Sequence, residues 1–188
     1  MELAYLVRSN QGEYMAQFIA RIIRAAKLEP RLYDEVETDT DATWQGVGVV
    51  LLSSLAAGIG SSRHTGLGGL VVGGLVALIA WYFWAFLTYL IGAKLFPMSQ
   101  TSVSHREVWR TLGFASVPGV LRVFGAAPGC TGAAFLVAAV WMLIAAVIAV
   151  RQAWDYTSTA RALGVCLPGW FVHVFLLLFL LLLLGQGE

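Results

Sequence analysis

The sequence predicts an all-α fold: a polytopic membrane helical bundle of five transmembrane helices, preceded by an amphipathic cytoplasmic arm. The 188-residue chain is 59% hydrophobic and only 12% charged, whereas soluble domains carry about a quarter charged residues. Of its 23 acidic and basic side chains, 13 lie in residues 1–42, and the remaining 146 positions hold ten. Five apolar stretches follow the arm in residues 43–188, and crossing a bilayer takes roughly 20 residues of helix.

The first predicted element is an amphipathic helix within the arm. In EYMAQFIARIIRAAKLEP, residues 13–30, apolar side chains recur at helical spacing with Arg21, Arg24 and Lys27 between them. Two interpretations of the basic face stay open: contact with anionic headgroups at the membrane surface, or packing on the protein's own cytoplasmic loops. Pro30 is expected to stop this helix, because proline disfavours a helical residue before it and donates no backbone hydrogen bond.

The densest charge is YDEVETDTD, residues 33–41, with five acids in nine positions. A calcium loop of the EF-hand type needs Gly at its sixth position and Glu at its twelfth, where this stretch has Ala42 and Gly48, so no metal site is expected. Capping of the first span and pairing with basic residues near the span ends are favoured over a solvated linker. The candidate interaction residues are Asp34, Glu37 and Asp41, with Arg106, Arg110, Arg151 and Arg161 as the basic partners.

The five spans are predicted at residues 43–60, 66–92, 111–127, 130–150 and 163–184. Within the second, Gly69 and Gly73 place small residues on one face, which predicts close contact with another helix of this chain or of a partner. The third is short and interrupted by Pro118 and Arg122, although proline is tolerated where neighbours satisfy the freed backbone groups. Arg122 is expected near the outer end of its span, where its side chain can snorkel.

The orientation follows from the basic residues. With a cytoplasmic N-terminus, ten Lys and Arg residues fall on the cytoplasmic side and two, Arg63 and Arg122, on the other. Because cytoplasmic loops carry the excess of basic residues, the N-terminus is predicted in the cytoplasm and the C-terminus on the opposite side of an inner or cytoplasmic membrane.

Four segments carry a family resemblance: residues 28–46, 84–97, 110–125 and 147–163, which read LEPRLYDEVETDTDATWQG, WAFLTYLIGAKLFP, RTLGFASVPGVLRVFG and VIAVRQAWDYTSTARAL. The chain resembles bacterial members of the Yip (Ypt-interacting protein) family over roughly Lys27 to Val172. The resemblance implies a five-span helical domain with a cytoplasmic N-terminal region. Eukaryotic relatives are associated with Rab GTPases and vesicle traffic, and the family supplies no active-site residues to transfer.

One side chain in the spans is a candidate for binding a cofactor. His173 lies in the middle of the fifth span, and a lone ionisable residue at that depth is a functional-site hypothesis. Its imidazole is expected either to form a hydrogen bond within the bundle or to ligate a haem or pigment, for which Gly169 would leave room. No cofactor is expected otherwise. The sequence shows no catalytic set of Ser, Cys, His or acidic residues, so an enzyme is not expected.

Three functions stay open. The favoured one is a non-enzymatic scaffold or interaction protein of the Yip type. The alternatives are an accessory subunit of a large energy-transducing or photosynthetic complex, and a small transporter or channel. The expected partners are the lipid bilayer and other membrane subunits or a second copy, because a net charge of +1 does not suggest nucleic acid.

Overall fold

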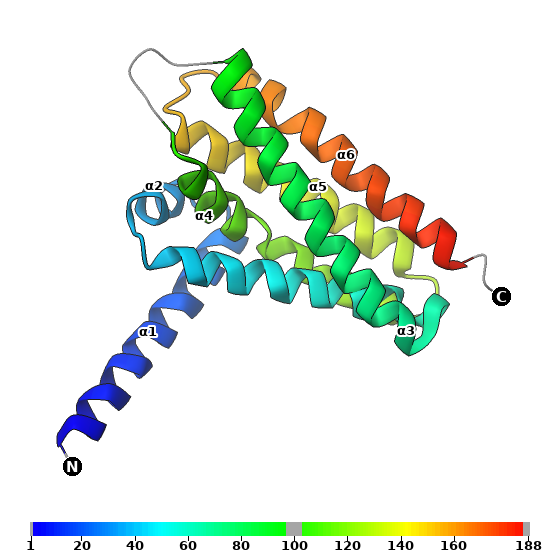
Figure 1. Cartoon of the computed structure of the whole chain (residues 1–188), viewed down its shortest axis with the longest axis horizontal. Helices are drawn as coiled ribbons and strands as arrows, with labels where there is room; N and C mark the ends of the chain where they lie inside the picture. The colour runs from blue at the N-terminus through cyan, green and yellow to red at the C-terminus, as the bar shows by residue number, and fades with distance from the viewer. Residues whose placement is uncertain (1, 97–102, 186–188) are drawn as a thin grey trace.

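Helices account for every regular element in residues 2–96 and 103–185, the part of the chain that the computed structural model describes (Figure 1). In this described part of the chain, four helical segments are long and apolar enough to cross a membrane, and a shorter apolar helix accompanies them. The predicted fold class, an all-α membrane bundle, is confirmed. The elements are α1 (Glu2–Ala26), α2 (Pro30–Thr38), α3 (Ala42–Leu95), α4 (His105–Ala115), the 3-10 helix η1 (Val117–Ala126), α5 (Thr131–Ala153) and α6 (Thr159–Gly185).

α3 supplies two spans because it folds back on itself (Figure 1). Its halves, Ala42–Ser62 and Leu70–Leu95, correspond to the predicted first and second spans. The halves meet at Gly58, where a Cβ atom would collide with the carbonyl oxygen of Leu70. Only a glycine permits so close an approach of the two backbones.

The predicted small-residue face of the second span lies partly at this contact. A Cβ atom on Gly73 would lie 2.8 Å from Ser61 Oγ, in the other half of the hairpin. Gly73 therefore packs within its own hairpin. Gly69 falls between the two halves, outside the residues whose surroundings the structure describes.

The predicted third span, residues 111–127, is not one continuous α-helix. α4 ends at Ala115, and η1 continues from Val117 as a 3-10 helix. Together, α4 and η1 nevertheless run beside the first half of α3, in the same direction and over the same depth. Successive contacts along both segments show this: Gly46 packs on Gly113, Ser53 on Gly119, and Gly60 on Gly125. The bundle thus combines four long helical segments with one broken crossing.

The break in this crossing has a sequence cause. Pro118 has no backbone N–H to donate to the preceding turn. The Ser116 backbone N–H donates to the Gly113 and Phe114 carbonyls, and Ser116 Oγ donates to the Leu112 carbonyl at 2.9 Å. The last carbonyls of α4 are thus occupied next to the interruption, as an apolar environment requires.

α5 and α6 complete the bundle. α6 runs antiparallel to the second half of α3, because Gly169 packs on Trp84 and Gly164 packs on Phe96. The bundle has two ends in Figure 1. The α2 end holds α2, α4 and the start of α6, and the hairpin end holds the turn of α3 and the end of α6.

α1 crosses the bundle near the α2 end, and its N-terminal part projects away from it (Figure 1). Phe18 anchors its C-terminal half, with its ring 3.7 Å from the position that a Cβ on Gly48 would take. α1 ends at Ala26, before the predicted stop at Pro30, because Leu28 adopts a left-handed conformation with φ 58°. Pro30 instead begins α2, where its missing N–H costs nothing.

Candidate functional site

Arg21 ties the arm to the bundle. Its side chain is only 3% exposed and lies 2.7 Å from carboxylate oxygens of both Glu35 and Asp39. Its Nη1 also donates to Gln45 Oε1 at 2.8 Å. One guanidinium therefore connects α1, α2 and the first turn of α3 through charge-assisted hydrogen bonds.

Arg24 extends this network along the same face of α1. Its guanidinium lies 2.5 Å from Glu35 and 3.2 Å from Glu29. Partial burial opposes ionisation of Glu35, but the hydrogen bonds from Arg24 and Arg21 outweigh it and hold the Glu35 pKa below its ordinary value. Burial also opposes ionisation of Asp39, but the charge and hydrogen bond of Arg21, together with the backbone N–H groups of Asp41 and Ala42, hold the Asp39 pKa below its ordinary value.

The predicted acidic candidates occupy different environments. Gln152 Nε2 donates to Asp34 Oδ1 at 2.9 Å, which joins α2 to α5. Arg110 donates to the backbone carbonyl of Glu37. Asp41 is exposed and makes no capping bond with its side chain.

The predicted basic partners of the acidic stretch make different contacts. Arg110 reaches the stretch through the backbone carbonyl of Glu37. Arg151 donates to the Tyr156 carbonyl at 3.4 Å and to Thr159 at 3.5 Å, so its observed contacts hold the turn between α5 and α6. Arg161 is exposed in the first turn of α6.

The ion-pair partners are instead Arg21 and Arg24 of α1, whose basic face was expected to meet headgroups or cytoplasmic loops. Residues three apart share one helix face, so the sequence did indicate that these two arginines act together. Nothing in the sequence indicated that this face meets α2 and not the bilayer.

Glu37 is the unusual carboxylate of this region. Burial raises its pKa to about 7, and the negative charges of Glu107, Asp155 and Asp34 add to the effect, while Arg110 opposes it. A carboxyl group with these surroundings changes charge near neutral pH. Four acids from α2, α4 and the turn after α5 therefore form one acidic surface, defined here as Asp34, Glu37, Glu107 and Asp155.

The four segments that carry the family resemblance converge at the α2 end. Asp34 of the first accepts from Gln152 of the fourth, and the Glu37 carbonyl accepts from Arg110 of the third. Tyr156 of the fourth donates from its hydroxyl to the Phe96 carbonyl of the second at 2.8 Å. Segments far apart in the chain thus build one surface.

A second polar cluster lies in the middle of the bundle. Arg122 was expected to snorkel near an outer span end, but its side chain is turned inward and the residue is 1% exposed. Its Nη2 contacts Met142 Sδ at 3.0 Å and His173 Nε2 at 3.2 Å. These two residues lie midway along α5 and α6, so the guanidinium lies near the centre of the bundle.

The contact with Arg122 determines which ring nitrogen of His173 carries the proton. A guanidinium only donates hydrogen bonds, so Nε2 of His173 accepts and its proton resides on Nδ1. The Trp84 ring packs against the imidazole, with ring centroids 5.4 Å apart, and a Cβ on Gly169 would lie 2.6 Å from Trp84 Cδ1. The room expected beside Gly169 is therefore filled by Trp84, and His173 offers no free Nε2 lone pair to a haem or pigment.

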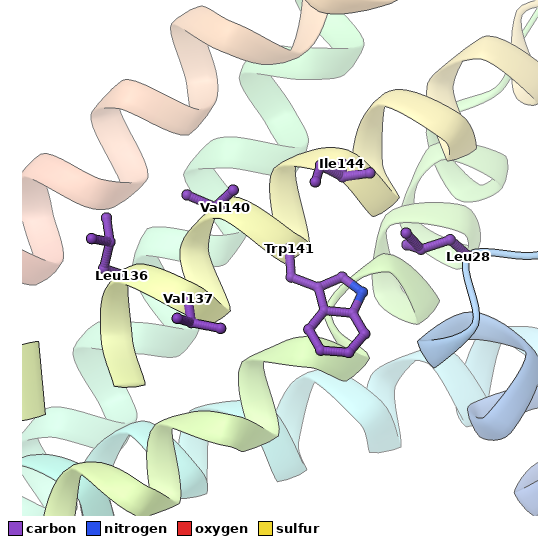
Figure 2. Close-up of a pocket in the computed structure, with 6 residues that line it drawn as sticks. All are labelled: Leu28, Leu136, Val137, Val140, Trp141 and Ile144. Carbon is purple, nitrogen blue, oxygen red and sulfur yellow. The ribbon is translucent and has the colours of Figure 1, made fainter. Parts of the chain in front are cut away.

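Two apolar grooves lie on the outside of the bundle. Figure 2 shows the larger, lined by Trp141 and neighbouring residues of α5 together with Leu28. The second lies along the hairpin of α3 and includes Ser54 and Gly74. Their lining side chains are almost entirely apolar, as expected for surfaces in contact with lipid.

Comparison with known proteins does not identify the chain. No family model, no curated protein and no solved structure matches it. The resemblance to the Yip family therefore stays a prediction.

Proposed function

We propose that the protein is a non-enzymatic membrane interaction protein of the Yip type, which docks a basic segment of a partner membrane protein at its acidic surface. In this proposal the α2 end faces the cytoplasm, in keeping with the ten basic residues assigned to that side. The observation that carries it is Glu37, half-buried among Asp34, Glu107 and Asp155.

The energetics favour a cationic ligand at this surface. Bringing like charges together and burying one of them is unfavourable for the isolated protein. Arg110 offsets only part of this cost, because its guanidinium is engaged with the Glu37 carbonyl and not with the carboxylate. A basic side chain from a partner would stabilise the ionised form of Glu37, and such complementarity guides association.

A photo-crosslinking experiment in native membranes tests this role. A photoreactive amino acid at Thr38, which is exposed on α2 beside Glu37, is expected to give a discrete adduct with one partner. The same probe at exposed Leu182, toward the hairpin end of α6, is the control and is expected to give none. Introducing Glu37→Gln and Glu107→Gln should remove the adduct at Thr38.

The outcomes separate the candidate functions. An adduct that persists in the double variant contradicts docking through the acidic surface. Purification in mild detergent adds a second readout, because co-elution of several foreign subunits with a visible absorption band would identify an accessory subunit of a pigment-bearing complex instead.

The raised pKa of Glu37 predicts a pH dependence. The pKa of Glu37 in the folded protein lies above its ordinary value, so binding of a proton to Glu37 stabilises the folded state. This stabilisation is lost as pH rises through about 7. We expect the thermal unfolding midpoint, followed by tryptophan fluorescence, to fall between pH 6 and 8 by the equivalent of about 1 kcal/mol. Glu37→Gln should flatten the profile, whereas Asp41→Asn at an exposed position should not.

We also propose that α1 lies in the membrane interface. Tyr14, Met15, Ile19 and Ile23 expose 43–54% of their surface, and Figure 1 shows α1 running crosswise to the spans. Both features are typical of helices that lie in the plane of the membrane surface. The polar face is held by Glu29, Glu35 and Asp39, so the apolar face is left for the lipid.

An environment-sensitive dye tests this placement. Attached at Met15→Cys in a Cys130→Ser background, the dye is expected to emit at shorter wavelength in liposomes, because its surroundings are apolar. Ile19→Asp should shift the emission toward that of water, since a charge on this face is costly in lipid. Gln17→Asp, on the polar face, should leave it unchanged, and an equal shift in both variants would contradict the placement.

A further inference from the structure

The middle of the bundle holds a cation, Arg122, that contacts no carboxylate among the residues that the structure describes. The sequence has no Asp or Glu between residues 42 and 106, and only Glu107, Asp155 and Glu188 after that. Glu107 and Asp155 lie at the α2 end, within the acidic surface. Arg122 is buried to 1% exposure. Its guanidinium contacts the neutral groups Met142 and His173, and it lies 5.9 Å from the centroid of the Phe135 ring.

An arginine in such a place remains protonated, because guanidinium does not lose its proton in proteins. A buried charge without a partner costs several kcal/mol. Arg122 also stays inward, although long basic side chains near a span end can reach the interface. Its position therefore indicates a binding partner for the charge.

The region around the Arg122 guanidinium contains hydrogen-bond donors that have no acceptor. Within the described structure, Arg122 Nε, Trp84 Nε1 and Thr88 Oγ1 are all buried without a hydrogen-bond partner. Trp84 packs against the imidazole that Arg122 contacts, whereas Thr88 lies one helical turn further along α3, beside Gly169.

The chemistry of these groups selects the ligand. Arg Nε–H and Trp Nε1–H can only donate, so they require an acceptor. One positive charge matches one negative charge. Trp84 packs tightly against Gly169, and this packing excludes a large ligand. We propose that Arg122 and Trp84 form a binding site for a small monovalent inorganic anion of the halide type at the centre of the bundle.

The test uses bromide and the full chain purified in mild detergent. Sodium bromide is titrated against sodium gluconate at constant ionic strength, because gluconate is a large organic anion that the tight packing at Trp84 excludes. The thermal unfolding midpoint is expected to rise saturably with bromide, as for any ligand that binds the native state. Arg122→Met should abolish the rise, and Arg122→Lys should retain part of it. Arg151→Met, at the α2 end, controls for loss of a positive charge elsewhere and should behave as the wild type.

A second variant keeps the test decisive if Arg122→Met does not fold. Trp84→Phe preserves an aromatic ring but removes the indole N–H, and it is expected to weaken bromide binding about tenfold. Trp44→Phe, at a residue 77% exposed in the first turn of α3, is the matched control and should bind as the wild type. Bromide also quenches tryptophan fluorescence, and the saturable part of the quenching should disappear in Trp84→Phe alone.

Two results would overturn the proposal. An unfolding midpoint of the wild type that does not depend on bromide would show that water, not an anion, satisfies the buried donors. The same bromide dependence in the wild type and Trp84→Phe would place the bound ion elsewhere.

Discussion

Replacing Gly60 with alanine is expected to lower the stability of the bundle by about 2–3 kcal/mol. A Cβ atom at this position would collide with the Arg122 carbonyl oxygen and lie 3.0 Å from the Phe135 ring. The obstacle is backbone, so no change of rotamer relieves it. η1 would have to move away from the first half of α3, along the interface where Ser53 meets Gly119 and Gly60 meets Gly125.

The chain supplies both the reporter and the control for this measurement. Cys166 is completely buried, so a thiol-reactive dye labels it only when the bundle unfolds, provided that exposed Cys130 is replaced by serine. Gly132→Ala makes the same substitution in the first turn of α5, where nothing lies within 4 Å of the added atom. We expect Gly132→Ala to unfold at the wild-type temperature or slightly above it. Equal midpoints for the two variants would contradict the close contact at Gly60.

The long helices were predictable because one physical rule dominates them. An apolar run of span length has few stable conformations besides a membrane helix, so α5 and both halves of α3 lie close to their predicted ranges. The third span followed this rule least. Pro118 signalled an interruption, but the sequence did not reveal that a 3-10 helix would continue the crossing and turn Arg122 inward.

The candidate sites were less predictable, because the sequence allows each of their side chains more than one contact partner. A basic face on an amphipathic helix looks the same whether it meets headgroups or carboxylates, and the contacts of Arg21 with Glu35 and Asp39 depend on the turn at Leu28. A polar contact within the bundle for His173 was one of two expectations. Its partner could not be identified, since Arg122 is 51 residues away and was placed at a different depth.

Replacing Arg21 with methionine is expected to release the arm from the bundle while the spans stay folded. The substitution keeps the length of the buried stem but removes the ion pairs with Glu35 and Asp39 and the hydrogen bond to Gln45. Losing hydrogen bonds to charged groups at a buried donor costs about 2 kcal/mol. Because the two carboxylates are partly exposed, water compensates part of the loss, and the effect stays below that of a fully buried pair.

Hydrogen exchange of the α2 amides measures this release directly, since local opening is reported separately from global unfolding. About 2 kcal/mol corresponds to exchange that is roughly 30-fold faster, confined to α2 and the C-terminal half of α1. Arg31→Met removes an equal charge from an exposed position of α2 and should leave the exchange unchanged. Arg21→Lys should give an exchange rate between those of the two methionine variants. An ammonium keeps the charge, but it lacks the planar guanidinium geometry that bonds Glu35, Asp39 and Gln45 at once. If Arg21→Met exchanged like Arg31→Met, apolar packing and not this guanidinium would hold the arm, and the acidic surface would not depend on α1.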